Sequence, residues 1–543
     1  MEKRLKRGAG ILLPISSLPS PYGIGTCGKA AYEFVDKLKK AGQTYWQVLP
    51  IGPTSYGDSP YQSFSTFAGN PYFIDLDMLA EEGILEKEDV QAVCWGGAED
   101  SIDYGTIYEN RFQILKKAFY NTKECGSGKY KKFVSDNREW LEDYSLFMAC
   151  KEHFNQREWL LWDKDIMARE PQALKHYSDI LKDNIMFWKY IQFKFYSQWD
   201  RLKKYANDNG IKIIGDIPIY VALDSSDVWA APGQYQLDEN LKPVDVAGCP
   251  PDIFSDYGQK WGNPLYNWDV MEKDGFTWWK RRMASAARMY DVIRIDHFIG
   301  IAKYYAIPAD GTPSEGEYRP GPAKKLTDAI DEAIVNAQII AEDLGVAMPE
   351  AKKLLQETGY PGMKVLEFAF DGHCSNEYLP HNYNKNCVVY TGTHDNDTLA
   401  GYLDTLGSKE HRYLQAYTGC MEKEVSAASV IRLAYGSVAD TAIIQMQDIL
   451  LKDNTARMNL PSTIGKNWRW RLKEGEFGEK EIEELFNLAD VYSRLPEIVY
   501  RVRWFEENKA EKCRKPRRQE KGKRTPKGKR KPVQRKPLHR GAS

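Results

Sequence analysis

Residues 292–298 read VIRIDHF, a short apolar stretch that carries a cation, Arg294, and a carboxylate, Asp296. Seven other stretches have a similar length and apolar character, and segments with helical periodicity separate them. Near-continuous apolar strands that alternate with helices are typical of parallel strands covered on the outside. Eight of them predict an α/β fold of the (β/α)8 barrel type. The predicted strands are residues 10–13, 45–50, 212–221, 292–298, 337–344, 363–370, 388–393 and 442–447.

Two of the connections between predicted strands are too long to be simple loops. Residues 75–205, after the second strand, predict an inserted helical subdomain, and residues 222–290, after the third, predict a loop-rich insertion over the active site. The catalytic barrel as a whole is expected to span residues 1–505. Helices with an apolar face are predicted at residues 30–41, 323–335, 350–357 and 479–492.

The last 38 residues differ in composition from the rest of the chain. Residues 506–543 contain 16 Lys/Arg and 4 Asp/Glu, a net charge of +12, whereas the remaining residues sum to −13. With four prolines and few large apolar residues, this segment predicts a disordered basic tail. A basic tail can bind nucleic acid or an acidic surface. We favour an incidental solvated extension, so nucleic acid is not expected as a partner.

Cysteine usage and hydropathy indicate the compartment. The nine cysteines are scattered and form no C-x-x-C pair, which argues against a disulfide framework and a structural zinc site. No stretch approaches the roughly 18–20 apolar residues of a membrane span. The apolar patch near the N-terminus is too short for a signal peptide and is interpreted as the first strand. A cytoplasmic protein is therefore expected.

Carboxylates recur at the carboxyl ends of the predicted strands, where barrel enzymes place their chemistry. Asp216 lies in the third strand, Asp296 in the fourth, Glu342 in the fifth, and Asp395 directly after the seventh. A single aspartate there is usually a helix cap, and Arg294–Asp296 alone could be a structural ion pair. Four carboxylates on one face are harder to explain structurally, because like charges repel.

The spacing of these residues suits a retaining glycosidic mechanism. Arg294 and Asp296 are two apart on a strand and point to the same side, so the guanidinium keeps the carboxylate ionised. Retaining enzymes need two carboxyl groups about 5–5.5 Å apart, and neighbouring strands are ~4.8 Å apart. We therefore expect Asp296 to be the nucleophile and Glu342 the acid/base, with its pKa raised by nearby anions. Asp395 could hold sugar hydroxyls from across the pocket.

Several longer motifs resemble a known family. RIDHF (294–298), AEDLG (341–345), THDN (393–396) and GDIPIYV (215–221) resemble the conserved regions of the α-amylase superfamily. Within it, SPYQSFSTFAGNPY (59–72) and PPDIFSDYGQKWGNPLYNW (250–268) are similar to the 4-α-glucanotransferases, also called amylomaltases or disproportionating enzymes. The resemblance runs from about residue 8 to about residue 500. It implies a cofactor-free retaining transglycosylase that passes an α-1,4-glucan segment to the 4-OH of glucose or a maltooligosaccharide.

The resemblance also implies roles for individual residues. Asp296, Glu342 and Asp395 would be the nucleophile, the acid/base and the transition-state stabiliser. The residues expected to bind or cover the sugar at the cleavage point are Tyr61, Asp216, Gln259, Trp261, Arg294 and His394. Tyr56 and Tyr104 match a pair that binds glucan away from the active site in the family; ordinary surface aromatics are the alternative. No metal is expected, because the acids are assigned to catalysis and no EF-hand-type loop is visible.

One motif departs from the family pattern. ARMNLPST (456–463) resembles the late active-site loop, but Ser462 stands where glycine is expected. Two other hypotheses stay open at this point. One is a hydrolase of the same fold, an α-amylase or α-glucosidase; the other is a glycogen-binding or regulatory protein with a dead site, or a nucleic-acid binder that uses the tail. Intact Asp296, Glu342 and Asp395 argue against a dead site. The oligomeric state is not predicted.

Overall fold

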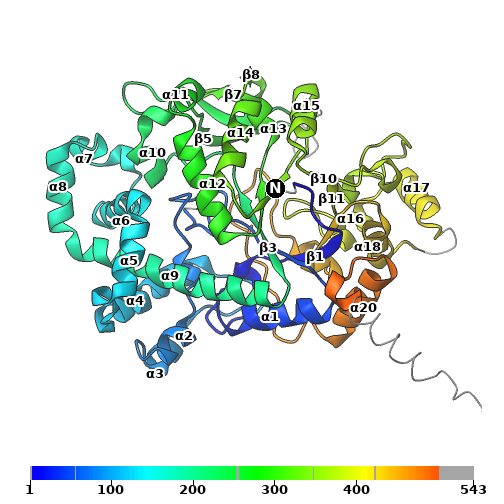
Figure 1. The fold of residues 1–543 in the computed structure, drawn as a ribbon, viewed down its shortest axis with the longest axis horizontal. Helices are drawn as coiled ribbons and strands as arrows, with labels where there is room; N and C mark the ends of the chain where they lie inside the picture. The colour runs from blue at the N-terminus through cyan, green and yellow to red at the C-terminus, as the bar shows by residue number, and fades with distance from the viewer. Residues whose placement is uncertain (1–2, 56, 252–255, 347, 421–423, 501–543) are drawn as a thin grey trace, which may run out of the picture. The chain divides into compact units, whose positions relative to one another are not determined.

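The protein is described by a computed structural model that covers residues 3–55, 57–251, 256–346, 348–420 and 424–500. The chain divides into two units, Met1–Pro496 and Glu497–Ser543. The fold described here is that of the first unit (Figure 1). The predicted tail, residues 506–543, lies outside the described residues.

Within the described residues, eight parallel strands form one sheet in the order β10-β11-β12-β1-β2-β3-β6-β9. The sheet is nearly closed, because the amide of Ala341, at the end of β9, donates to the carbonyl of Pro361, just before β10, at 2.9 Å. The predicted (β/α)8 barrel is confirmed. The strands are β1 Gly8–Leu12, β2 Tyr45–Gln47, β3 Lys212–Ile217, β6 Val292–Ile295, β9 Gln338–Ala341, β10 Gly362–Val365, β11 Cys387–Tyr390 and β12 Thr441–Gln445.

Seven of the eight barrel strands are shorter than predicted, and the fourth shows why. VIRIDHF was predicted as one strand, but β6 ends at Ile295. His297 adopts a left-handed backbone conformation, with φ at 48°, which a strand cannot contain. Asp296 is therefore the first residue beyond the strand. Its amide still donates to Ile217 of the neighbouring β3, at 3.0 Å, which fixes its position at the barrel mouth.

Helices cover the outside of the barrel, and their apolar faces are those the periodicity predicts. In α1, Lys29–Lys40, the buried residues are Ala31, Phe34, Val35 and Leu38. Helix α20, Glu479–Val491, buries Ile482, Leu485 and Ala489. The other helices after β3 are α10 Ser226–Ala230, α11 Trp268–Lys273, α12 Thr277–Met289, α13 Ile299–Ala302, α14 Lys324–Ala333, α15 Pro349–Thr358, α16 Leu399–Thr405, α17 Ser408–Thr418, α18 Ala427–Gly436 and α19 Met446–Ile449.

The connection between β2 and β3 is helical. It contains α2 Leu76–Glu81, α3 Lys87–Gln91, α4 Tyr104–Asn121, α5 Gly128–Asp136, α6 Arg138–His153, α7 Lys164–Met167, α8 Pro171–Ile180 and α9 Lys182–Asp208. Helices α4 to α8 gather on one side of the barrel (Figure 1). The long helix α9 packs against α4, α5, α6 and α8. Its buried Gln192 exchanges two hydrogen bonds of 2.8 Å with the backbone of Gly69, in the loop after β2.

A second sheet was not predicted. Four antiparallel strands lie in the order β5-β4-β7-β8: β4 Asp245–Cys249, β5 Gln259–Pro264, β7 Lys303–Pro308 and β8 Glu317–Pro320. The sequence of β5, QKWGNP, contains glycine and proline and does not alternate, so it is typical of a loop. This sheet matters for the site because β5 carries Gln259 and Trp261.

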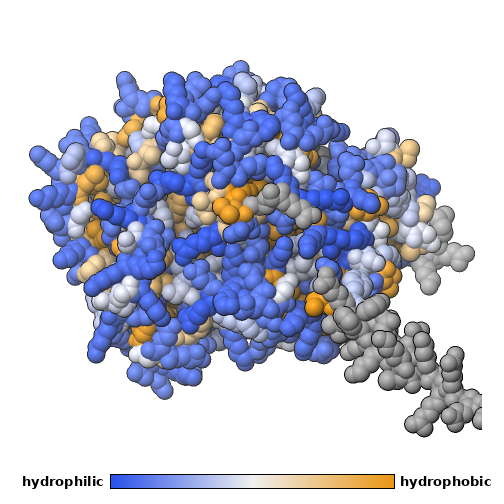
Figure 2. Space-filling model, in the orientation of Figure 1, coloured by the Kyte–Doolittle hydropathy of each residue, from blue (hydrophilic) through white to orange (hydrophobic). Residues whose placement is uncertain are grey.

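Polar side chains dominate the face of the molecule drawn in Figure 2. On the face drawn in Figure 2, hydrophobic residues appear as small, separate patches among hydrophilic ones. Among the helices that the structure describes, none is both long enough and apolar enough to cross a membrane.

Candidate active site

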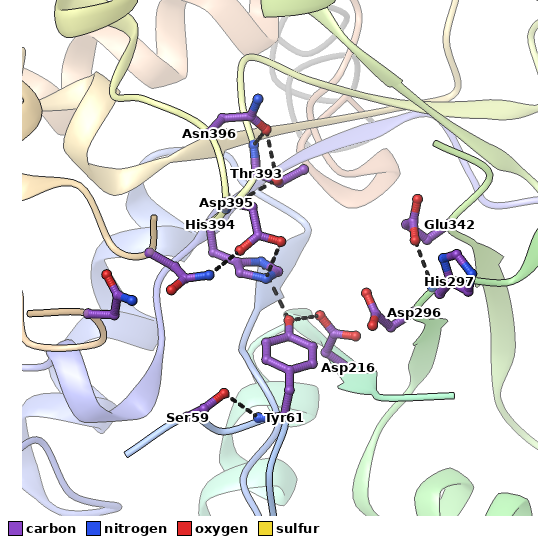
Figure 3. A network of polar contacts seen from close by, with 12 residues as sticks. Ser59, Tyr61, Asp216, Asp296, His297, Glu342, Thr393, His394, Asp395 and Asn396 are labelled. Atoms are coloured by element: carbon purple, nitrogen blue, oxygen red, sulfur yellow. Dashed lines mark hydrogen bonds and ion pairs between the residues drawn. The ribbon is translucent and has the colours of Figure 1, made fainter. Parts of the chain in front are cut away.

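A cavity of about 470 Å³ lies at the carboxyl ends of the barrel strands. This volume is in the range of small-ligand sites. Eight of the predicted site residues line it: Tyr61, Gln259, Trp261, Arg294, Asp296, Glu342, His394 and Asp395. They come from loops and strand ends far apart in the sequence, which the barrel brings to one mouth. Figure 3 shows Asp296 and Glu342 on one side of this mouth and Asp395 with His394 on the other.

Arg294 is the electrostatic centre of the site. Its Nη1 lies 2.7 Å from both oxygens of Asp216 and 3.0 Å from Oδ1 of Asp296. Burial disfavours the charge of Arg294, but the two carboxylates outweigh this and raise its pKa. The Arg294 side chain is 4% exposed, whereas that of Asp296 is 28% exposed. Asp296 therefore presents an oxygen to the cavity while a permanent cation supports its negative charge.

The structure places Asp216 beneath the cavity and not in its lining. Its side chain is fully buried, and it accepts a 2.8 Å hydrogen bond from the Tyr61 hydroxyl in addition to those from Arg294. Burial raises the pKa of Asp216, and the charge of Arg294 opposes this. In this arrangement Asp216 orients Arg294 and Tyr61, and its predicted contact with the sugar stays a prediction.

Glu342 lies at the end of β9 and is 8% exposed. Its Oε2 accepts the amide of His297 at 2.7 Å, and its Oε1 accepts the amide of Leu344 at 2.8 Å. Burial, reinforced by the charge of Asp296, raises the pKa of Glu342 to about 8, although Arg294 and the two amides favour the anion. The group is therefore mostly protonated at neutral pH, as a general acid requires.

Asp395 stays ionised in spite of its surroundings. Burial raises its pKa, but His394, whose Nε2 lies 3.3 Å from Oδ2, and Asn459, whose Nδ2 donates to Oδ1 at 2.6 Å, outweigh burial and lower the pKa of Asp395 to about 2. The three carboxyl groups of the cavity thus have different environments. Such a separation marks acid/base assignments in glycosidases.

Aromatic rings form the walls of the cavity. The ring of Tyr61 stacks on His394, with centroids 5.0 Å apart and planes at 17°, and Trp468 lies 5.8 Å from the same histidine. On the opposite wall, Trp261 contacts the ring of His297 edge-on at 4.8 Å, and its Nε1 donates to Oε1 of Gln259 at 3.1 Å. The faces and edges of such rings suit the C–H surface of a sugar.

The sequence analysis missed His297, Asn459 and Trp468 as site residues. All three line the cavity, and the first two stand inside motifs that carry the family resemblance, RIDHF and ARMNLPST. The sequence could have predicted these two, because residues that lie in a matched motif just after a strand also lie at the mouth of the barrel. Burial lowers the pKa of His297 to about 4, so its imidazole is neutral and can both donate and accept a hydrogen bond.

Ser462 occupies a left-handed position, with φ at 62°. Glycine adopts this conformation at little cost, and serine does so less readily. The expectation that this position suits glycine is therefore consistent with its backbone.

The predicted second glucan site is only half described. Tyr56 lies outside the described residues. Tyr104 begins α4, is 7% exposed and donates its hydroxyl to the carbonyl of Trp468 at 2.8 Å. The ring is thus packed and does not form an open platform in this conformation, and glucan binding there stays a prediction.

Comparison with known proteins gives consistent matches over most of the chain. A family model described as 4-alpha-glucanotransferase matches residues 13–476. The 4-alpha-glucanotransferase of Clostridium butyricum is 50% identical over 483 residues, 88% of this chain and 99% of that protein. That of Streptococcus pneumoniae strain ATCC BAA-334 is 47% identical over 496 residues, 91% and 98% of the two chains. The structure of the amylomaltase from Streptococcus agalactiae in complex with acarbose matches with a TM-score of 0.88 and 42% identity, over 90% of this chain and all of that one.

Proposed function

We propose a mechanism from the premise that this chain belongs to the 4-α-glucanotransferase family. In it, the chain cleaves an α-1,4 bond of a maltooligosaccharide or starch chain and passes the glucan segment to the 4-OH of an acceptor glucose or maltooligosaccharide, with retention of configuration. One observation supports this most strongly: an arginine-held carboxylate, Asp296, and a carboxyl with a raised pKa, Glu342, line one sugar-sized cavity.

In the first half-reaction Asp296 attacks the anomeric carbon. Its oxygen forms the ester bond while the glycosidic C–O bond breaks, and Glu342 donates its proton to the departing oxygen. Arg294 lies 3.0 Å from the attacking group, and its guanidinium orients that carboxylate until the bond forms. Asp395, ionised across the cavity, stabilises the positive charge that develops on the sugar.

In the second half-reaction the roles of Glu342 reverse. Once Asp296 is esterified, it no longer carries the charge that helps to raise the pKa of Glu342. The amides of His297 and Leu344 then favour the anion. Glu342 accepts the proton of the incoming 4-OH as that oxygen attacks the anomeric carbon and frees Asp296. The same electrostatic coupling therefore drives both directions of proton transfer.

The alternative activity is hydrolysis, in which water resolves the same intermediate. Family membership favours transfer. The aromatic rings of Tyr61, Trp261 and Trp468 line the cavity, where they can exclude water and bind a second sugar.

The product profile of maltotriose tests the proposed function. We expect glucose and longer maltooligosaccharides to appear together, with almost no increase in reducing ends, because each transfer makes one reducing end for each one it consumes. Chromatography of the products and a reducing-end assay on the same samples measure this. A steady increase in reducing ends would instead assign the chain as a hydrolase.

The pH dependence of kcat/KM tests the assignment of Glu342. The pKa of Glu342 in the free enzyme is raised to about 8, so the catalytic proton is present below that pH and is lost above it. We expect kcat/KM for maltotriose to fall as pH rises through about 8. Asp395, with a pKa lowered to about 2, should impose no limit above about pH 4. A decline of kcat/KM centred at about pH 4.5, the ordinary pKa of glutamate, would contradict the assignment.

The proposal extends to the domain organisation, the cofactor requirement, the compartment and the partners of the protein. Residues 75–205 and 222–290 act as inserted subdomains on a barrel of residues 1–505, and the second brings Gln259 and Trp261 over the cavity. The protein works without a cofactor or metal, in the cytoplasm, on α-1,4-glucans and not on nucleic acid. Seven cysteines in the described part of the chain, Cys27, Cys94, Cys125, Cys150, Cys374, Cys387 and Cys420, are free thiols, which suits a reducing compartment.

A further inference from the structure

Two side chains on the segment after α19 hold the loop that carries Asp395. Arg457 uses three nitrogens: Nη2 donates to the carbonyl of Asp395 at 2.6 Å, Nη1 pairs with the carboxylate of Asp397, and Nε donates to the carbonyl of Asn459 at 2.8 Å. Only a planar guanidinium presents donors in this fixed fork. Two of these bonds reach residues 395–397, and the third holds the side chain against its own segment.

Asn459 completes the connection from the side of the cavity. Its side-chain Nδ2 donates to Oδ1 of Asp395 at 2.6 Å, and its backbone N–H donates to the carbonyl of His394 at 3.1 Å. The backbone of His394 and both the backbone and the carboxylate of Asp395 are thus bound by one short segment. We call Arg457 and Asn459 the 457–459 clamp.

Arg457 also interacts electrostatically with Glu367, which belongs to a group of buried carboxyls that the mechanism does not use. Asp448 accepts the Thr391 hydroxyl at 2.5 Å and the amide of Leu399 at 2.7 Å. Oε1 of Glu367 is buried and has no hydrogen-bond partner among the described residues. Burial, together with the charges of Asp448 and Asp397, raises the pKa of Glu367, and Arg457 opposes this rise. Without the guanidinium, the carboxylate of Asp397, on the loop that carries Asp395, would lose its ion-pair partner.

We propose that Arg457 and Asn459 are positioning residues that fix the carboxylate of Asp395 in the cavity, Arg457 through its backbone and Asn459 through a direct hydrogen bond. The proposal rests on the proposed function, because it assumes that Asp395 acts on the sugar. A carboxylate that stabilises a developing charge must be held within a fraction of an ångström. The clamp supplies that restraint from outside the barrel strands.

Asn459→Asp gives the sharpest test, because it replaces a donor by a second carboxylate. Two carboxylates within hydrogen-bond distance cannot both ionise easily, so one proton is retained to higher pH. The groups around Asp395 that titrate or carry charge are His394 and Asp397 on its own loop, Arg457 of the clamp, Arg294 in β6, and Tyr61 from the loop after β2. Tyr61 in turn interacts with Asp216 and Asp296. None of them changes in this variant.

The expected result is a new acidic limb in kcat, at higher pH than any acidic limb of the unmodified chain. Activity of Asn459→Asp should fall about tenfold between about pH 6 and about pH 4 and should return when the sample is brought back to about pH 7. Asn459→Ala should lose activity at all pH values without the new limb. A misfolded variant would not recover its activity in this way. Coincident pH profiles for Asn459→Asp and the unmodified chain would overturn the proposal.

Arg457 is tested by separating kcat from KM. Arg457→Met should lower kcat for maltotriose by about 10²-fold with KM changed much less, because Arg457 does not line the cavity and acts on transition-state alignment. Arg457→Lys keeps the charge but loses the planar array of donors, so its kcat should lie between those of Arg457→Met and the unmodified chain. Arg432→Met, at an exposed arginine on α18, is the matched control. Unchanged kcat in Arg457→Met would overturn the proposal.

Failure of the proposed function gives a different result. In that case the unmodified chain itself would not disproportionate maltotriose. Failure of the clamp would leave the unmodified chain active and the pH profile and kcat of the variants unmoved.

Discussion

Disproportionation of maltotriose falls by on the order of 10⁴-fold or more when Asp296 is replaced by asparagine. The amide nitrogen and oxygen cannot form the glycosyl ester, so the covalent route closes. Binding should change little, because Arg294 keeps its two bonds of 2.7 Å to Asp216 and the cavity walls stay in place. Initial rates from glucose release and a dissociation constant for maltotriose by calorimetry measure the two effects separately.

A matched control comes from a surface aspartate. Asp328 on α14 pairs with Lys324 and its side chain is 55% exposed, so Asp328→Asn removes the same charge far from the cavity and should leave the rate unchanged. An Asp296→Asn variant that retains more than about a tenth of the unmodified rate, after deamidation to aspartate is excluded by mass spectrometry, would remove Asp296 from the nucleophile role.

Replacing Glu342 by glutamine lowers the same rate by about 10²–10⁴-fold, the range of general acid–base catalysis. An amide cannot deliver the proton to the leaving oxygen. It is also an imperfect replacement here, because both oxygens of Glu342 accept backbone amides. The glutamine NH₂ must face one of those donors, so a modest loss of stability is expected beside the loss of activity.

The leaving group decides which step is lost. An α-maltotriosyl fluoride donor needs no proton to depart, so Glu342→Gln should still form the glycosyl-enzyme from it and then resolve it slowly. Glu350→Gln is the control and should behave like the unmodified chain. The side chain of Glu350 is 49% exposed and pairs with Lys303. Equal losses of the first step with the fluoride and with maltotriose would mean that Glu342 does not supply the proton.

The electrostatics of the site explain why these two carboxyls behave differently. Asp296 has a guanidinium at 3.0 Å and an open side toward the cavity, whereas Glu342 is buried beside an anion. Arg294 cannot neutralise both, because it also binds Asp216 with two short contacts. Because this cation lies directly against Asp216 and Asp296, the proton is held by buried Glu342, whose pKa is raised to about 8.

The barrel and the catalytic strand ends could be predicted from the sequence because strongly apolar strands give a clear signal. The register β3–β6–β9 pairs Asp216 with Arg294 and Ile295 with Ala341. It therefore follows from adjacency alone that residues just beyond these pairs, Asp296 and Glu342, meet at one mouth.

Features that depend on long-range packing could not be predicted in the same way. The antiparallel sheet forms from short segments on two separate connections, which only come together once the barrel exists. The burial of Asp216 arises because Tyr61, from the loop after β2, and Arg294, from β6, converge on it. Asn459 reaches Asp395 from 64 residues away. No local pattern in the sequence records these contacts.

The most direct test of the mechanism is to trap the covalent intermediate. Glu342→Gln is mixed with α-maltotriosyl fluoride, quenched in acid, digested and mapped by tandem mass spectrometry. The account predicts one added maltotriosyl group, joined as an ester to Asp296 in the peptide that contains RIDHF. A label on Asp395 or on any other residue, or the absence of a label while the fluoride is consumed, would contradict it.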